Sequence, residues 1–137
     1  RGKKIVFTNG CFDLLHAGHV RYLDAAKSCG DVLILGLNSD RSVKALKGSG
    51  RPINLQMDRA YILAALEAVD YVVIFDEDTP YNLIEAIKPK TLVKGADYGL
   101  EQVVGSNFVR ENGGDVMLVN VEPGYSTTNT IARITGS

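Results

Sequence analysis

The chain has 137 residues, a length typical of one domain built around a single hydrophobic core. Hydrophobic residues make up 45% of the sequence and charged residues 23%, which is ordinary for a globular protein. There are 15 basic and 16 acidic residues and the formal net charge is -1, so the charge balance favours neither nucleic acid nor an anionic membrane. We therefore expect one domain over residues 1–137, with no nucleic-acid and no membrane partner.

Other features of the sequence bear on its compartment and extent. It contains no apolar run of the length of a membrane span and no recognisable signal peptide. Its two cysteines, Cys11 and Cys29, do not make a disulfide framework, so we expect a cytoplasmic location. The first residue is Arg1 rather than Met, which leads us to expect either a trimmed chain or a piece of a longer polypeptide.

Short runs rich in Val, Ile and Leu alternate with stretches of helical periodicity along the chain. The apolar runs are nearly continuous, as in strands covered on both faces, and predict strands at residues 4–8, 32–37, 71–75, 91–94 and 116–121. The helical stretches predict helices at residues 18–29, 55–68, 81–88, 100–112 and 127–134. This order predicts an α/β fold: a single Rossmann-like, doubly wound domain with a five-stranded parallel sheet and helices on both faces.

Two connections between these elements carry local signals. Thr79 and Pro80 have the residue types of an N-cap and a first helical position, and Pro89 stops the helix that they begin. Residues 38–54 form the longest irregular part, with two glycines and four basic residues. A long polar loop after the second strand is either a solvated connection or a mobile lid.

The segment after the first strand is the most informative part of the sequence. It contains both histidines of the chain, His16 and His19, within the four residues His-Ala-Gly-His. A strand that ends in a tight turn and opens a helix directs backbone N–H groups and the positive helix end toward one point. Gly10 belongs to this turn, and Gly18 leaves room for a phosphate to approach the backbone. The pattern predicts a polyphosphate site; a partial metal site or two solvated polar residues are the alternatives, and no further ligands stand at a metal-binding spacing.

The sequence lacks the standard motifs for nucleotide and acyl chemistry, namely the P-loop, the GxGxxG fingerprint and the GxSxG elbow. Basic side chains instead lie at the carboxyl ends of predicted strands or near helix starts. Besides the two histidines these are Lys44, Lys47, Arg59 and Lys94. Residues 124–128, Gly-Tyr-Ser-Thr-Thr, open the last predicted helix, where they form either a second phosphate cradle or a simple N-cap.

These motifs resemble those of the HxGH cytidylyltransferase-like nucleotidyltransferases. The match begins with Gly-Cys-Phe-Asp at residues 10–13 and His-Ala-Gly-His at residues 16–19. It continues in family order over nearly the whole chain, through residues 38–40, 47–48, 58–59, 70–72 and 124–128. Within this family the chain is most similar to the heptose-1-phosphate adenylyltransferases, at residues 8–13, 50–54, 75–80 and 93–98.

The resemblance implies transfer of AMP from ATP to D-glycero-β-D-manno-heptose 1-phosphate, giving ADP-heptose and pyrophosphate for lipopolysaccharide core synthesis. It implies that the catalytic residues are His16, His19, Lys47 and Arg59, with no protein nucleophile, no protein metal ligand, and Mg²⁺ that arrives with ATP. The nucleotide would be bound by these four residues together with Gly10, Cys11, Phe12, Gly18, Gly95, Tyr125, Ser126, Thr127 and Thr128. The acceptor would be bound by Asp13, Lys94, Asp97 and Tyr98.

The resemblance also implies partners and leaves alternatives open. ATP and heptose 1-phosphate are the expected small molecules, and a sugar kinase domain is expected in the full-length protein, since such relatives are often fused behind one. The oligomeric state stays open, a homo-oligomer included. A CTP-dependent cytidylyltransferase acting on glycerol 3-phosphate or a similar phosphorylated alcohol is the alternative function, because strand periodicity does not distinguish adenine from cytosine. At single positions, Asp13 is alternatively a turn former, Lys47 a solvated residue and Cys11 a packed side chain.

Overall fold

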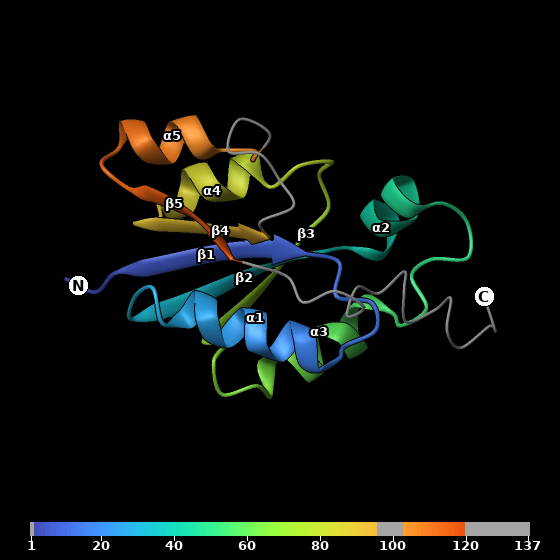
Figure 1. Ribbon diagram of the computed structural model, residues 1–137. Helices are drawn as coiled ribbons and strands as arrows, with labels where there is room; N and C mark the ends of the chain where they lie inside the picture. The colour runs from blue at the N-terminus through green and yellow to red at the C-terminus, as the bar shows by residue number, and fades with distance from the viewer. Residues whose placement is uncertain (1, 96–102, 120–137) are drawn as a thin grey trace.

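The computed structural model describes residues 2–95 and 103–119, and Figure 1 shows how their elements are arranged. The strands are β1 (Ile5–Gly10), β2 (Val32–Asn38), β3 (Tyr71–Phe75), β4 (Thr91–Gly95) and β5 (Asp115–Val119). The helices are α1 (Ala17–Lys27), α2 (Asp40–Lys47), α3 (Gln56–Ala64), α4 (Tyr81–Ile87) and α5 (Ser106–Glu111). Within these two ranges, no helix is both long and apolar enough to cross a membrane.

The five strands form one parallel sheet in the spatial order β3-β2-β1-β4-β5. The chain moves outward from the central β1 to β2 and β3, and then returns to the other side of β1 to form β4 and β5. Helices α1 and α3 cover one face of the sheet and α4 and α5 the other, while α2 lies beyond the carboxyl ends of the strands (Figure 1). The reversal of strand order places a switch point between the carboxyl ends of β1 and β4, which is where such sheets bind ligands.

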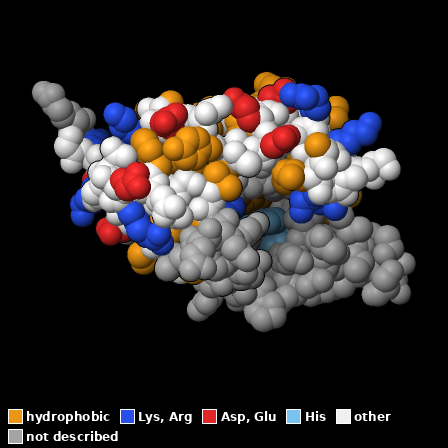
Figure 2. Space-filling view, turned by 90° about the horizontal axis from the view of Figure 1, so that it is seen from above, with side chains coloured by type: hydrophobic (Ala, Val, Ile, Leu, Met, Phe, Trp, Pro, Cys, Tyr) orange, Lys and Arg blue, Asp and Glu red, His pale blue; other side chains and the backbone are white. Residues whose placement is uncertain are grey.

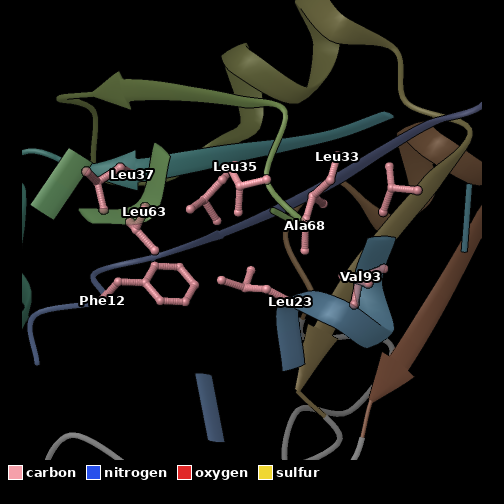
Figure 3. Close-up of a cluster of buried hydrophobic side chains, with 11 residues drawn as sticks. Phe12, Leu23, Leu33, Leu35, Leu37, Leu63, Ala68 and Val93 are labelled. Carbon is pink, nitrogen blue, oxygen red and sulfur yellow. The ribbon is translucent and has the colours of Figure 1, made fainter. Parts of the chain in front are cut away.

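Each face of the sheet has its own core, because neighbouring side chains of a strand point to opposite faces. Val6 joins the core under α1 and α3, whereas the next residue, Phe7, joins the core under α4 and α5. The first core also contains Leu23, Leu33, Leu35, Leu37, Leu63 and Val93 (Figure 3). Full burial of one such side chain contributes about 1.5–3 kcal/mol to the free energy of unfolding. Both faces therefore hold the strand ends in fixed positions beneath the loops that follow them.

The structure confirms the predicted α/β class and all five strands, and it corrects several helix ends. α3 ends at Ala64, since the chain then turns to place Ala68 and Val69 in the core before β3. Pro80 is the N-cap of α4 and not its first residue. The helix predicted at residues 100–112 begins only at Ser106, because the residue before it, Gly105, has a left-handed φ of 85°. The helix predicted at residues 127–134 lies outside the described residues.

The prediction of a loop over residues 38–54 is wrong for its first half, which forms α2. Ser39 is the N-cap, and its hydroxyl oxygen accepts a hydrogen bond of 3.1 Å from the backbone N–H of Ser42. Asp40 in the first turn and Lys47 in the last turn complement the helix dipole. Gly48 then ends the helix with a φ of 95°. These end signals are present in the sequence, but two glycines and a proline follow them directly, and that composition is typical of a loop.

Candidate functional site

β1 ends in a turn that requires glycine at position 10. A Cβ atom on Gly10 would lie 2.7 Å from the ring of Phe12, closer than real Cβ contacts. Phe12 has a φ of 46°, in the left-handed region that few non-glycine residues adopt, and its ring is buried beside Leu23 and Leu63 (Figure 3). The ring thus anchors the turn from within the core, and the turn leads the chain to the start of α1.

The two histidines lie at that helix start. His16 is the N-cap of α1 and His19 is its third residue. Their rings stack, with centroids 3.9 Å apart and planes inclined by 20°, and Phe12 packs edge-on against His19. The backbone N–H of His16 donates to Nδ1 of His19 over 3.3 Å. Because Nδ1 accepts, the neutral ring carries its proton on Nε2, so His19 is a hydrogen-bond donor at Nε2.

Burial lowers the pKa of His19 to about 4, and the neighbouring His16 and Lys47 lower it in the same direction. The His19 ring is therefore neutral near pH 7. Lys47, at the end of α2, also acts on Cys11: burial raises the pKa of the Cys11 thiol, while Lys47 and two arginines oppose that rise. Because Lys47 acts electrostatically on both His19 and Cys11, the end of α2 lies near the end of β1. In the space-filling view the histidines are visible at the surface, with Lys or Arg side chains nearby (Figure 2).

Asp13, only 1% exposed, joins the turn after β1 to the segment after α2. Its carboxylate accepts hydrogen bonds from the backbone N–H groups of Ile53 and Asn54, each within 2.9 Å, and from Nε of Arg51 at 2.8 Å. The side-chain amide of Asn54 donates to the backbone oxygen of Asp13. Although burial raises the pKa of Asp13, these hydrogen bonds and the Arg51 charge lower it below its ordinary value. The carboxylate therefore pins residues 51–54 against the turn.

Arg59 of α3 is the largest fully buried side chain among the described residues, with 2% exposure. Its Nη1 donates to the backbone oxygens of Cys11 and Asn38, both at 2.8 Å. Its Nε donates to the backbone oxygen of Asn54 at 2.9 Å, and its Nη2 pairs with a carboxylate oxygen of Asp40 at 2.8 Å. The guanidinium therefore links the carboxyl ends of β1 and β2 to the starts of α2 and α3.

The predicted site residues fall into distinct groups in the structure. His16, His19, Lys47 and Cys11 lie together at the end of β1, with Gly18 in the first turn of α1. Asp13 and Arg59 lie beneath them and bond to other parts of the protein. Lys94 lies toward the β4 side of β1, where its Nζ donates to the backbone oxygen of Asn9 at 3.2 Å, and Gly95 ends β4. The predicted residues outside the described ranges are Asp97, Tyr98, Tyr125, Ser126, Thr127 and Thr128.

Sequence reasoning missed the residues that complete the two buried networks. They are Asn38, Asp40, Arg51 and Asn54. The Gly-Arg-Pro-Ile-Asn segment at residues 50–54 signals a turn, but turn signals do not name the group that the turn binds. Arg51 and Asp13 are 38 residues apart in the sequence, and only the folded chain brings them together.

The fold and site define a class of protein. A doubly wound parallel sheet with paired imidazoles at a helix start, beside a lysine, has the geometry and the donors that suit a phosphorylated nucleotide. The model of the family described as cytidylyltransferase-like matches residues 7–133. The chain therefore belongs to the cytidylyltransferase-like family of nucleotidyltransferases.

Curated relatives and solved structures agree with this family. The bifunctional protein HldE of Campylobacter fetus is 64% identical over 98% of this chain, and that of Aliarcobacter butzleri is 66% identical over 97%. The chain spans only 29% and 27% of the lengths of these two relatives. A structure of the lipopolysaccharide core biosynthesis protein from Thermoplasma volcanium superposes with a TM-score of 0.73 at 25% identity, covering 88% of this chain and 98% of that one. A protein of unknown function from Archaeoglobus fulgidus shares the fold, with a TM-score of 0.64 at 22% identity, over 90% of this chain and 93% of its own.

Proposed function

We propose that this chain is an adenylyltransferase that moves AMP from ATP to D-glycero-β-D-manno-heptose 1-phosphate. The products would be ADP-heptose and pyrophosphate, used in lipopolysaccharide core synthesis. The observation that carries the proposal is the stacked pair His16 and His19 at the start of α1, with Lys47 in electrostatic reach. The similarity to HldE proteins and to a lipopolysaccharide core biosynthesis protein supports the heptose pathway.

The proposed chemistry is a displacement at phosphorus. An oxygen of the sugar phosphate attacks the α-phosphorus of ATP, the bond from that phosphorus to the bridging oxygen breaks, and pyrophosphate leaves with the electron pair. Because the attacking group is already an anion, the protein needs no nucleophile and acts by positioning and by stabilising charge. The proton on Nε2 of His19 suits a phosphate oxygen, and a polyphosphate beside the ring would oppose the low pKa of His19.

Lys47 and Arg59 take different parts in this proposal. The Lys47 ammonium is exposed at the end of α2, where it can approach the phosphates. The Arg59 guanidinium already makes four hydrogen bonds within the protein. We therefore assign Arg59 to positioning: it holds the backbone at Cys11 and Asn38, and through it the loops around the nucleotide.

Mg²⁺ fits this site as an ion that arrives with ATP. Among the residues that the structure describes, no group of three His, Cys, Asp or Glu side chains could hold a metal ion. The imidazoles and the ammonium at the end of β1 suit phosphate oxygens, so the phosphates and water would supply most ligands to Mg²⁺. The ion would neutralise phosphate charge during the transfer.

One assay tests the activity. Pyrophosphate release is measured with Mg²⁺ and either ATP or CTP, in the presence of heptose 1-phosphate or glycerol 3-phosphate. We expect release with ATP and heptose 1-phosphate, and little with either alone. Release with CTP and glycerol 3-phosphate would instead support the alternative, a cytidylyltransferase, which the family description favours. Absence of release in all four combinations would contradict both.

The length of the relatives raises a further proposal. Since the matched part is less than a third of each HldE protein, we propose that the natural protein carries a second domain, a sugar kinase. Such a kinase would make the sugar 1-phosphate that this chain consumes. Sequencing the gene beyond this segment tests the proposal directly.

A further inference from the structure

A second hollow lies on the β4 side of β1, away from the histidines. It is a cavity of about 130 Å³, far more than the roughly 15 Å³ that one water needs. Its polar lining consists of Asn9 from β1, Lys94 from β4, and Asp78 and Thr79 from the connection between β3 and α4. All four positions lie at or beyond the carboxyl ends of strands, around the switch point of the sheet.

The side chains of this cavity suit a phosphorylated sugar. A carboxylate, a hydroxyl and an amide, from Asp78, Thr79 and Asn9, can exchange hydrogen bonds with several sugar hydroxyls. The Lys94 ammonium, which donates to the backbone oxygen of Asn9 at 3.2 Å, adds a positive charge at the β1 side of the cavity. Pro80 and two valines supply the apolar part of the lining, against which the C–H face of a sugar can pack.

The same lining suits a nucleobase less well. None of the residues that line this cavity in the described part of the chain is aromatic, so none of these residues can stack a ring on a base. The Asp78 carboxylate would also repel a polyphosphate, whereas the His16 and His19 side of β1 is rich in donors and positive charge. The nucleotide phosphates and the sugar can thus occupy opposite sides of the β1 end and meet above it.

We propose that Asp78 is a specificity-determining residue, which selects a sugar 1-phosphate over smaller phosphorylated alcohols by accepting hydrogen bonds from the sugar hydroxyls. This inference rests on the proposed nucleotidyl transfer and adds to it the residue that selects the acceptor. A carboxylate discriminates in this way because an acceptor without the matching hydroxyls leaves it poorly paired. In this arrangement Asp78 contacts the acceptor and not the nucleotide, so its effect should be confined to the use of the acceptor.

The test compares Asp78→Ala with a matched control, Glu77→Ala, which removes a neighbouring exposed carboxylate that does not line the cavity. For each protein, kcat/KM is measured with ATP and heptose 1-phosphate, and with ATP and glycerol 3-phosphate. We expect Asp78→Ala to lower the ratio of kcat/KM for heptose 1-phosphate to kcat/KM for glycerol 3-phosphate by about tenfold to a hundredfold. This is the effect of a lost hydrogen bond to a charged group. The KM for ATP should stay within about twofold of wild type, and Glu77→Ala should leave the ratio unchanged.

Two contrary results are distinguishable. If wild type transfers AMP to heptose 1-phosphate and the ratio is the same in Asp78→Ala and Glu77→Ala, the inference is overturned while the proposed function stands. If wild type releases no pyrophosphate, and calorimetry with a non-hydrolysable ATP analogue finds no binding of heptose 1-phosphate, both are overturned. Calorimetric binding of heptose 1-phosphate that Asp78→Ala weakens at least tenfold, and Glu77→Ala does not, supports the inference independently of turnover.

Discussion

The carboxyl end of β1 separates two candidate sites that are built differently. On the α1 and α3 side, buried charges form a closed network: Asp13 and Arg59 are 1% and 2% exposed, and each makes several hydrogen bonds within 3 Å. On the α4 and α5 side, the cavity is lined by Asp78 and Thr79, which are exposed, and by Lys94, which is half-buried. The first construction fixes backbone positions before a ligand arrives, which suits charge stabilisation in a reaction.

The second construction leaves the side chains of Asp78 and Thr79 exposed, where a substrate can reach them. Exposed residues on a connection can change without disturbing a core, so such a site can alter its specificity at little cost in stability. The difference suggests that rate depends on the rigid side of β1 and substrate choice on the open side.

Replacement of Arg59 by Leu should have the largest effect on stability. The change removes the partner of the Asp40 carboxylate and the donor to three backbone oxygens, and each buried group left unsatisfied costs about 1–3 kcal/mol of unfolding free energy. Urea denaturation followed by circular dichroism measures the loss. The control is Arg41→Leu, which removes an exposed arginine paired with Asp76 and should change stability little. Equal losses in the two variants would show that the buried network does not stabilise the fold.

Replacement of His16 or His19 by Ala should act on the rate. Each removes a donor from the point where charge grows during the transfer, which lowers kcat by about 100-fold to 1000-fold. ATP affinity, measured by calorimetry, should change only modestly, since the other phosphate contacts remain. Lys44→Ala, an exposed change on α2, serves as the control. Near-normal turnover in both histidine variants would contradict the assignment of this site to nucleotidyl transfer.

Replacement of Asp13 by Asn should loosen the segment that it binds. The amide keeps the shape of the side chain, but it cannot accept hydrogen bonds from Arg51 and from the backbone N–H groups of Ile53 and Asn54 as the carboxylate does. We therefore expect the unfolding free energy to fall by about 1.5–3 kcal/mol. Hydrogen exchange at the amides of Ile53 and Asn54 should become faster. Asp31→Asn is the control, because its carboxylate accepts from the exposed backbone N–H of Lys4, just before the amino end of β1. Unchanged exchange at residues 53 and 54 would mean that other contacts hold this segment.

The pH dependence of stability should reveal the buried His19. Its pKa is about 4 in the folded chain and 6.5 as an ordinary value, so between these pH values the unfolded chain binds more protons. The unfolding free energy therefore falls as the pH drops from 6.5 to 4, by about 2–3 kcal/mol from this group. In His19→Gln this fall should be smaller. Parallel curves for the two proteins, from thermal or urea unfolding at each pH, would show that His19 is not perturbed in this way.

The α/β order, and the prediction of a phosphate site at the β1 end, follow from local sequence. Nearly continuous apolar runs with Gly and Pro between them predict parallel strands that are covered on both faces. Such a prediction is possible because hydrophobic periodicity and turn residues are properties of a few consecutive residues. The two histidines stand out for the same reason, since a strand, a turn and a helix start are local features. Even α2 had its signals in Ser39, Asp40 and Gly48.

The tertiary structure alone decided what the charged residues do. The sequence marks Asp13 and Arg59 as candidates to touch a substrate, but the fold buries both and surrounds them with backbone groups from segments up to 48 residues away. It also brings together Asn9, Asp78 and Lys94, three residues from separate parts of the chain. Such contacts depend on strand order and helix packing, and these are determined by interactions throughout the core. A residue type therefore predicts which bonds a side chain can make, and only the folded chain determines its partner.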